Sequence, residues 1–176
     1  MFKKNIVVIS VIVVLLLIAA SVFYSQQKNK SLGMESIAGH SLSVVLTSYD
    51  EIVSSKAESF SPDNIASLRQ KLIKIEAYSD IIDQAVEYEA LKPIAANLLS
   101  LTENIEKSYK ANDGKLTDKS KEDYRILETE IQNLIPLIHK TYYVPGTEAK
   151  ASLKITEQGI KQIKERLSNY VAGKLK

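Results

Sequence analysis

The chain has 176 residues, with 23 basic residues, 21 acidic residues and no cysteine. This length allows about one folded domain plus an N-terminal segment, and the lack of cysteine excludes structural disulfides, thiolate metal sites and thiol catalysis. The near-balance of charge predicts no nucleic-acid partner, although residues 1–30 carry +4, residues 31–149 carry −7 and residues 150–176 carry +5.

Residues 6–24 form an apolar run without a charged residue. As a helix, these 19 residues would cover about 28 Å, close to the hydrocarbon thickness of a bilayer. Phe23 and Tyr24 end the run, where aromatic side chains favour the membrane interface. We therefore predict a transmembrane signal-anchor over 6–24, between a short cytoplasmic N-terminus over 1–5 and a juxtamembrane linker over 25–31.

The orientation and the fate of this run stay open at the level of sequence. Its flanking lysines are balanced: Lys3 and Lys4 before it, Lys28 and Lys30 after it. A short basic start before an apolar run favours an N-terminus in the cytoplasm and a C-terminal domain outside it. The small residues of Ala19-Ala20-Ser21 fit a signal-peptidase site, and cleavage there would release a secreted protein. The apolar run continues into Val22 and Phe23, which favours retention as an anchor.

Beyond the linker, apolar residues recur at alternating spacings of four and three, which is typical of helices packed side by side. The spacing predicts helices over 32–58, 62–89, 91–111, 118–141 and 148–172, and no strands. The predicted core positions are Ala38, Leu42, Val45, Tyr49, Ile52, Ile65, Leu68, Leu72, Ile75, Ser79, Ile82, Val86, Leu91, Ile94, Leu98, Leu101, Ile105, Tyr124, Leu127, Ile131, Leu134, Ile138, Ala149, Leu153, Thr156, Ile160, Ile163, Leu167 and Tyr170. We predict an all-α protein whose residues 32–176 form an antiparallel four- or five-helix bundle with coiled-coil-like seams.

Local signals support these boundaries and leave one of them open. Ser61-Pro62-Asp63 supplies an N-cap, a proline at the first helical position and an acid in the first turn. Pro93 has no turn residue before it, so it either kinks one long helix near Glu89 or lies where two helices meet. Pro136 falls inside the fourth predicted helix and is expected to bend it near Gln132.

The sequence carries no motif that predicts catalysis or a cofactor. The segment 109–122 superficially resembles a calcium-binding EF-hand loop, but only Asp113 occupies a ligand position, so we interpret it as a turn. The two histidines, His40 and His139, lack the Glu-x-x-His pairing of a di-iron bundle, and His40 is expected at the surface. We predict no enzymatic activity, no cofactor and no metal ligand.

Two features could serve binding. The first is a basic C-terminal segment that could contact an anionic surface through Lys150, Lys154, Lys161, Lys164, Arg166, Lys174 and Lys176. Alternatively, these side chains form a solvated face that complements the acidic remainder of the bundle. The second is a tip formed by Tyr142, Tyr143 and Val144, which either contacts a partner or packs against a neighbouring helix.

Together, these patterns predict a membrane-anchored protein of the bacterial cell surface whose extracytoplasmic bundle binds or scaffolds another membrane or cell-surface protein, with an unknown oligomeric state. Two alternatives remain. One is a cleaved, secreted helical protein such as an inhibitor or adhesin, and the other is a structural rod that self-associates through its seams.

Overall fold

The computed structural model describes residues 21, 23–25, 33, 36–55, 61–142 and 157–173. The chain divides into two units, residues 1–36 and residues 37–176. In the first unit the described residues are helical and exposed, Phe23 and Tyr24 among them. The predicted span over 6–24 lies almost entirely outside the described residues. Within the described ranges, no helix is both long and apolar enough to cross a membrane.

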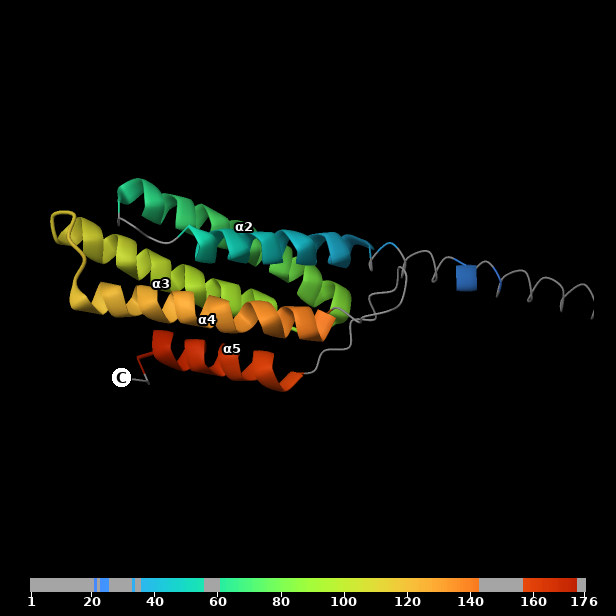
Figure 1. The fold of residues 1–176 in the computed structure, drawn as a ribbon. Coiled ribbons are helices and arrows are strands. Elements are labelled where there is room, and N and C mark those ends of the chain that lie inside the picture. The colour runs from blue at the N-terminus through green and yellow to red at the C-terminus, as the bar shows by residue number, and fades with distance from the viewer. Residues whose placement is uncertain are drawn as a thin grey trace, which may run out of the picture. The chain divides into compact units, whose positions relative to one another are not determined.

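The second unit is a bundle of helices, which confirms the predicted all-α class (Figure 1). It contains a helix over residues 36–54, which begins at the boundary between the units, followed by α2 (Pro62–Val86), α3 (Leu91–Ala111), α4 (Asp118–Tyr142) and α5 (Glu157–Val171). Successive helices run in opposite directions. Helix α3 lies at the centre, because it contacts α2, α4 and α5. None of the described residues forms a strand.

The predicted core stripes face the interior of the bundle. All five positions of the helix over 36–54 are buried, as are all five predicted for α3. Leu68, Val86, Tyr124 and Tyr170 are only partly buried. Three predicted positions, Ala149, Leu153 and Thr156, lie outside the described residues. The spacing of four and three therefore identified most of the residues whose burial drives the packing of this unit.

Helix α2 starts as its sequence predicts and ends three residues earlier than predicted. Ser61 Oγ accepts a hydrogen bond from the backbone nitrogen of Asn64 at 3.2 Å, which caps the first turn. At the other end, Glu87 adopts a left-handed conformation with φ 54°, and this stops the helix after Val86. The prediction that this helix reaches residue 89 was wrong, because no glycine marks the turn.

Pro93 and Pro136 lie at different places in their helices. Residues 87–90 are not helical and α3 begins at Leu91, so two helices meet before Pro93. Pro93 is the third residue of α3, where a backbone N–H would have no partner within the helix. Pro136 lies inside α4, which continues to Tyr142. The bend expected near Gln132 stays a prediction.

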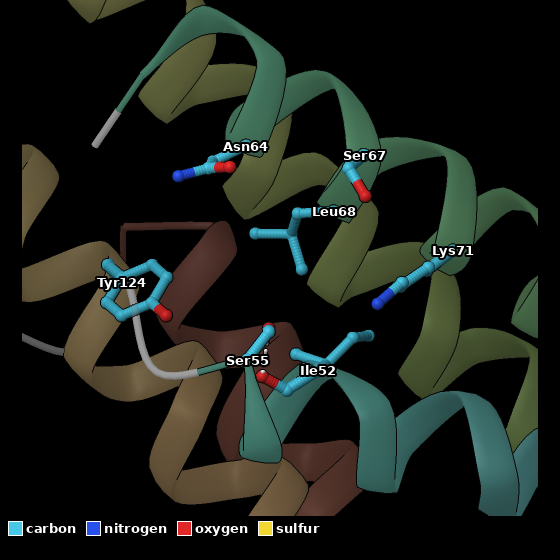
Figure 2. Close-up of a pocket in the computed structure, with 7 residues that line it drawn as sticks. All are labelled: Ile52, Ser55, Asn64, Ser67, Leu68, Lys71 and Tyr124. Carbon is cyan, nitrogen blue, oxygen red and sulfur yellow. Dashed lines mark hydrogen bonds between the residues drawn. The ribbon is translucent and has the colours of Figure 1, made fainter. Parts of the chain in front are cut away.

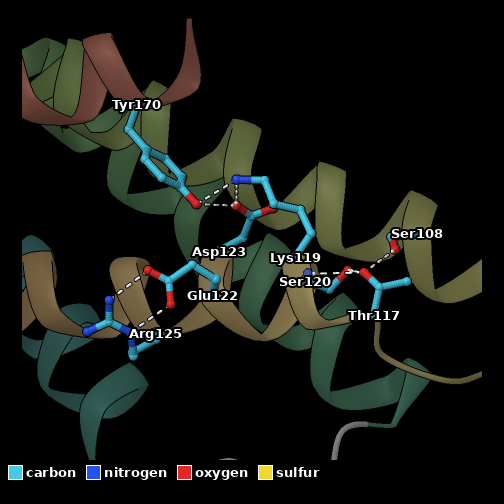
Figure 3. Close-up of polar contacts among 8 residues, drawn as sticks. All are labelled: Ser108, Thr117, Lys119, Ser120, Glu122, Asp123, Arg125 and Tyr170. Atoms are coloured by element: carbon cyan, nitrogen blue, oxygen red, sulfur yellow. Dashed lines mark hydrogen bonds and ion pairs between the residues drawn. The ribbon is translucent and has the colours of Figure 1, made fainter. Parts of the chain in front are cut away.

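A tight turn joins α3 to α4, in place of an EF-hand site. Asp113 and Gly114 both have positive φ, and the nitrogen of Gly114 donates to the carbonyl of Tyr109 at 3.0 Å. Thr117 Oγ1 then accepts a hydrogen bond from the nitrogen of Ser120 at 3.1 Å and caps α4. Thr117 also shares a hydrogen bond with Ser108 at the end of α3, as Figure 3 shows. The turn is thus explained by helix capping alone.

Candidate functional site

Three residues of α4, spaced seven apart, face α5: Asp123, Glu130 and Leu137. Each contacts a different part of α5, since Tyr170 bonds Asp123, Arg166 bonds Glu130 and Gly159 lies against Leu137. Residues seven apart on a helix share one face. We call Asp123, Glu130 and Leu137 the acidic stripe. It runs antiparallel to α5, because rising numbers on α4 meet falling numbers on α5.

At one end of the acidic stripe, Asp123 belongs to a group of three polar side chains (Figure 3). Tyr170 Oη donates to Asp123 Oδ1 at 2.8 Å, and Lys119 Nζ lies 2.9 Å from the same oxygen. Lys119 Nζ also donates to Tyr170 Oη at 2.6 Å. The hydrogen bonds with Tyr170 and Asp123 raise the pKa of Lys119, and burial raises the pKa of Tyr170. The group therefore brings the nearly buried carboxyl group of Asp123 together with an amine and a phenol.

In the middle of the acidic stripe, Arg166 forms a two-pronged ion pair with Glu130. Its Nε and Nη2 atoms donate to the two carboxylate oxygens at 2.9 and 2.7 Å. The Glu130 side chain is 11% exposed and that of Arg166 is 47% exposed, so the carboxylate is the buried partner. This geometry matches the planar fork of guanidinium to a carboxylate. The hydrogen bond with Glu130 raises the pKa of Arg166 further.

At the other end of the acidic stripe, Gly159 permits a close approach of α5 to α4. A Cβ atom at this position would lie 2.8 Å from Cδ2 and 3.1 Å from Cδ1 of Leu137. Side-chain atoms do not normally approach so closely, so any larger residue would have to push Leu137 aside. Glycine inside a helix costs about 1 kcal/mol relative to alanine. The close approach of Leu137 explains why a glycine occupies this position in spite of that cost.

The acidic stripe is a candidate binding surface, because it combines an apolar contact with two carboxylates that are mostly shielded from water. Such a surface recognises a helix that supplies both apolar side chains and cations in the matching register. In this structure α5 fulfils that role. The sequence did not predict this surface, because an acid at the edge of a core stripe looks the same in sequence as an acid on a solvated face.

A second candidate is a cavity of about 90 Å³ between the helix over 36–54, α2 and α4 (Figure 2). Its lining residues are Ile52, Ser55, Asn64, Ser67, Leu68, Lys71 and Tyr124. Lys71 Nζ lies 3.5 Å from the Glu51 carboxylate, and Ser55 Oγ donates to the carbonyl of Ile52 at 2.8 Å. The cavity is well below the about 300–1,000 Å³ of most small-molecule sites. Since its cation and one of its hydroxyls already have partners within the protein, we do not assign a ligand to it.

A buried carboxylate joins α2 to α3. Asp83 accepts hydrogen bonds from three successive backbone nitrogens, those of Ala90, Leu91 and Lys92, at 3.0, 3.0 and 2.9 Å. Burial raises the pKa of Asp83, against the opposing effect of these hydrogen bonds. Because the carboxylate satisfies the first turn of α3, we interpret Asp83 as a structural cap.

The residues predicted for an anionic surface are partly engaged within the bundle. Lys164 Nζ donates to the carbonyl of Glu89 at 2.8 Å, and Arg166 pairs with Glu130. Lys161 is exposed. The other four, Lys150, Lys154, Lys174 and Lys176, lie outside the described residues. Lys164 and Arg166 thus contact other parts of the bundle, and contact of the basic segment with an anionic surface stays a prediction.

Of the predicted tyrosine tip, only Tyr142 is described. Its side chain is completely buried, so this residue follows the packing alternative and is not accessible to a partner. Its hydroxyl has no hydrogen-bond partner among the described residues, and burial raises the pKa of Tyr142, with a further contribution from Asp83. Tyr143 and Val144 lie outside the described residues.

The histidines and carboxylates do not form a metal site in the described part of the chain. His40 is exposed, as predicted, and its ring meets the ring of Tyr78 edge-on with centroids 6.3 Å apart. His139 is also exposed. Among residues 36–55, 61–142 and 157–173, no group of three metal-binding side chains comes together.

Comparison of the chain with family models, with curated proteins and with solved structures found no match.

Proposed function

We propose that this chain is a single-pass membrane protein that acts by binding rather than by catalysis. The observation that carries the proposal is the uncharged apolar run over 6–24, which is long enough to span a bilayer and is followed by a helical bundle. In this proposal, residues 1–5 lie in the cytoplasm, and residues 32–176 form the extracytoplasmic domain, whose helices pack through coiled-coil-like seams. The partner is another membrane or cell-surface protein.

The bundle supports a binding role through its surface chemistry. Among the described residues, some ordered polar groups cap helices, as Asp83 does, and others join helices, as Glu130 does. Two groups that join α4 to α5 lie along the acidic stripe. Surfaces that combine apolar contacts with buried, paired charges give specificity in protein association.

Cell fractionation with intact-mass measurement tests this proposal. A full-length chain in the membrane fraction, degraded by external protease to a short anchored stub, is the expected result. A chain that begins near Val22 and is found in the medium would contradict the anchor, and would support a cleaved, secreted binding protein instead. Sedimentation of the purified chain at several concentrations would separate either form from a self-associating rod.

A further inference from the structure

Helix α5 has a smaller apolar attachment than the central helix of the bundle. Within residues 157–171, the fully buried apolar residues of α5 are Ile160, Ile163 and Leu167, and Tyr170 and Val171 pack partly buried against the core. The fully buried apolar residues of α3 are Leu91, Ile94, Ala95, Leu98, Leu101 and Ile105. A helix of 15 residues is marginal in water on its own. The described part of α5 is therefore held by few buried apolar residues together with its polar contacts.

These polar contacts are distributed along α5, and those of Arg166 and Tyr170 are partly buried. Lys164 bonds the carbonyl of Glu89, Arg166 pairs with Glu130, and Tyr170 bonds Asp123. Arg166 is about half exposed. Partly exposed ion pairs are weakened by salt and contribute little to stability. Local opening of α5, without unfolding of α2, α3 and α4, is the expected consequence.

The departure of α5 would leave a specific surface behind. The acidic stripe would then present Leu137 together with the carboxylates of Asp123 and Glu130, both of which are nearly buried when α5 is in place. Asp123 would keep its ion pair with Lys119, which also lies on α4, so Glu130 is the carboxylate that loses its cation. Carboxylates in an apolar surface favour a ligand that brings cations and hydrogen-bond donors to them. Residues 143–156 join α4 to α5 in the sequence, so a displaced α5 would stay covalently attached to the bundle.

We propose that α5 is a displaceable strap, and that the acidic stripe beneath it binds a basic amphipathic helix of the partner protein. The partner helix has apolar side chains at the spacing of Ile160, Ile163 and Leu167, and a guanidinium group opposite Glu130. This proposal deepens the binding role proposed above and rests on it, but its tests do not depend on where the chain is located.

Hydrogen exchange of the purified full chain tests the opening of α5. We expect the amides of α5 to exchange at least about tenfold faster than the buried amides of α3. Arg166→Glu should accelerate exchange in α5 and leave α3 unchanged, because two carboxylates would then face each other. The double variant Arg166→Glu/Glu130→Arg restores the pair with reversed charges and should return α5 to its original exchange rate. Exchange of α5 and α3 at equal rates would overturn the proposal, since α5 would then be an inseparable part of the core.

Binding of a helix in trans tests the surface itself. The probe is a labelled synthetic peptide with the sequence of residues 157–173, added to the full chain. It should bind the Arg166→Glu chain at least about tenfold more tightly than the unmodified chain, because the apparent affinity falls with the fraction of chains whose surface is open. The Glu130→Arg chain also loses its ion pair with α5, but it should not gain affinity for this peptide, because its stripe lacks the carboxylate. A peptide that carries Glu in place of Arg166 should bind this second variant instead.

Two results would overturn this part of the proposal. The first is equal affinity of the peptide for the unmodified chain and the Arg166→Glu chain. The second is the formation of dimers by Arg166→Glu in sedimentation, because exchange of α5 between two copies would then explain the opening without a separate partner. Failure of either test leaves the membrane location to be decided by fractionation, so the two proposals can fail independently.

Discussion

The carboxylate of Asp83 on α2 accepts a hydrogen bond from the backbone nitrogen of Leu91, the first residue of α3, at 3.0 Å. The neighbouring nitrogens of Ala90 and Lys92 donate to the other carboxylate oxygen, and Pro93 has no N–H group to satisfy. One side chain therefore replaces the local cap that α3 lacks. This fixes the corner between α2 and α3.

Replacement of Asp83 by alanine should lower the free energy of unfolding by about 1–3 kcal/mol, because buried backbone donors would lose their acceptor. The measurement is urea unfolding followed by circular dichroism. The control is Asp63→Ala, which removes an exposed acid from the first turn of α2 and should cost about 0.3–1 kcal/mol. Equal losses for the two variants would contradict the capping role of Asp83.

The contribution of Asp83 should also depend on pH. Burial raises the pKa of Asp83 above its ordinary value of 3.8 in the folded state. As the pH falls toward that value, the Asp83 carboxylate is protonated in the folded chain at a higher pH than in the unfolded chain. Protonation of Asp83 therefore favours the folded state, and the stability that Asp83 contributes rises. Urea unfolding of the unmodified chain and of Asp83→Asn at a series of pH values tests this, because the other carboxyl groups titrate in both. The difference in stability should shift in favour of the unmodified chain as the pH is lowered. A shift in the opposite direction would mean that the backbone hydrogen bonds outweigh burial.

The buried hydroxyl of Tyr142 should destabilise the bundle. None of the described residues forms a hydrogen bond with it, so Tyr142→Phe is expected to raise the free energy of unfolding by up to about 2 kcal/mol. Tyr170→Phe serves as the comparison, because it removes the same atom from a hydroxyl that bonds both Lys119 and Asp123. That variant should lower stability. A loss on Tyr142→Phe would show that its hydroxyl does have a partner.

The close contact between Gly159 and Leu137 should make the two positions interdependent. Gly159→Ala should lower the opening free energy of α5 by about 1 kcal/mol, because the added methyl group overpacks the interface. With Leu137→Ala as background, the same change should raise it by up to about 1 kcal/mol, since alanine is the better helix former. Hydrogen exchange of the α5 amides in the four variants of this cycle gives the coupling. Identical effects of Gly159→Ala in both backgrounds would show that the contact with Leu137 is unimportant.

The periodicity of the sequence was sufficient to predict the helices and most of the core. Leu72, Leu98, Leu127 and Ile163 all lie at predicted positions and are buried. Burial of apolar area dominates the folding of such a bundle, and its period is visible in the sequence. The start of α2 was predicted because Ser61 and Pro62 are residues with a specific role at a helix N-terminus.

The buried acids and the end of α2 could not be predicted in the same way. Asp83, Asp123 and Glu130 acquire their roles from partners 7 to 47 residues away along the chain, and periodicity contains no information about such pairs. Glu87 ends α2 in a left-handed conformation that glycine or asparagine usually adopts. For the three acids, contacts between helices, not local preference, decide the structure.

Site-specific labelling from outside the cell tests the central claim, a bundle held outside the membrane by residues 6–24. The chain has no cysteine, so single variants can be labelled cleanly with a membrane-impermeant maleimide. Asn104→Cys lies on an exposed position of α3, and Asn5→Cys lies in the segment proposed to be cytoplasmic. We predict that Asn104→Cys is labelled on intact cells, that Asn5→Cys is labelled only after permeabilisation, and that both chains are in the membrane fraction. Protection of Asn104→Cys until the cells are permeabilised would contradict the claim.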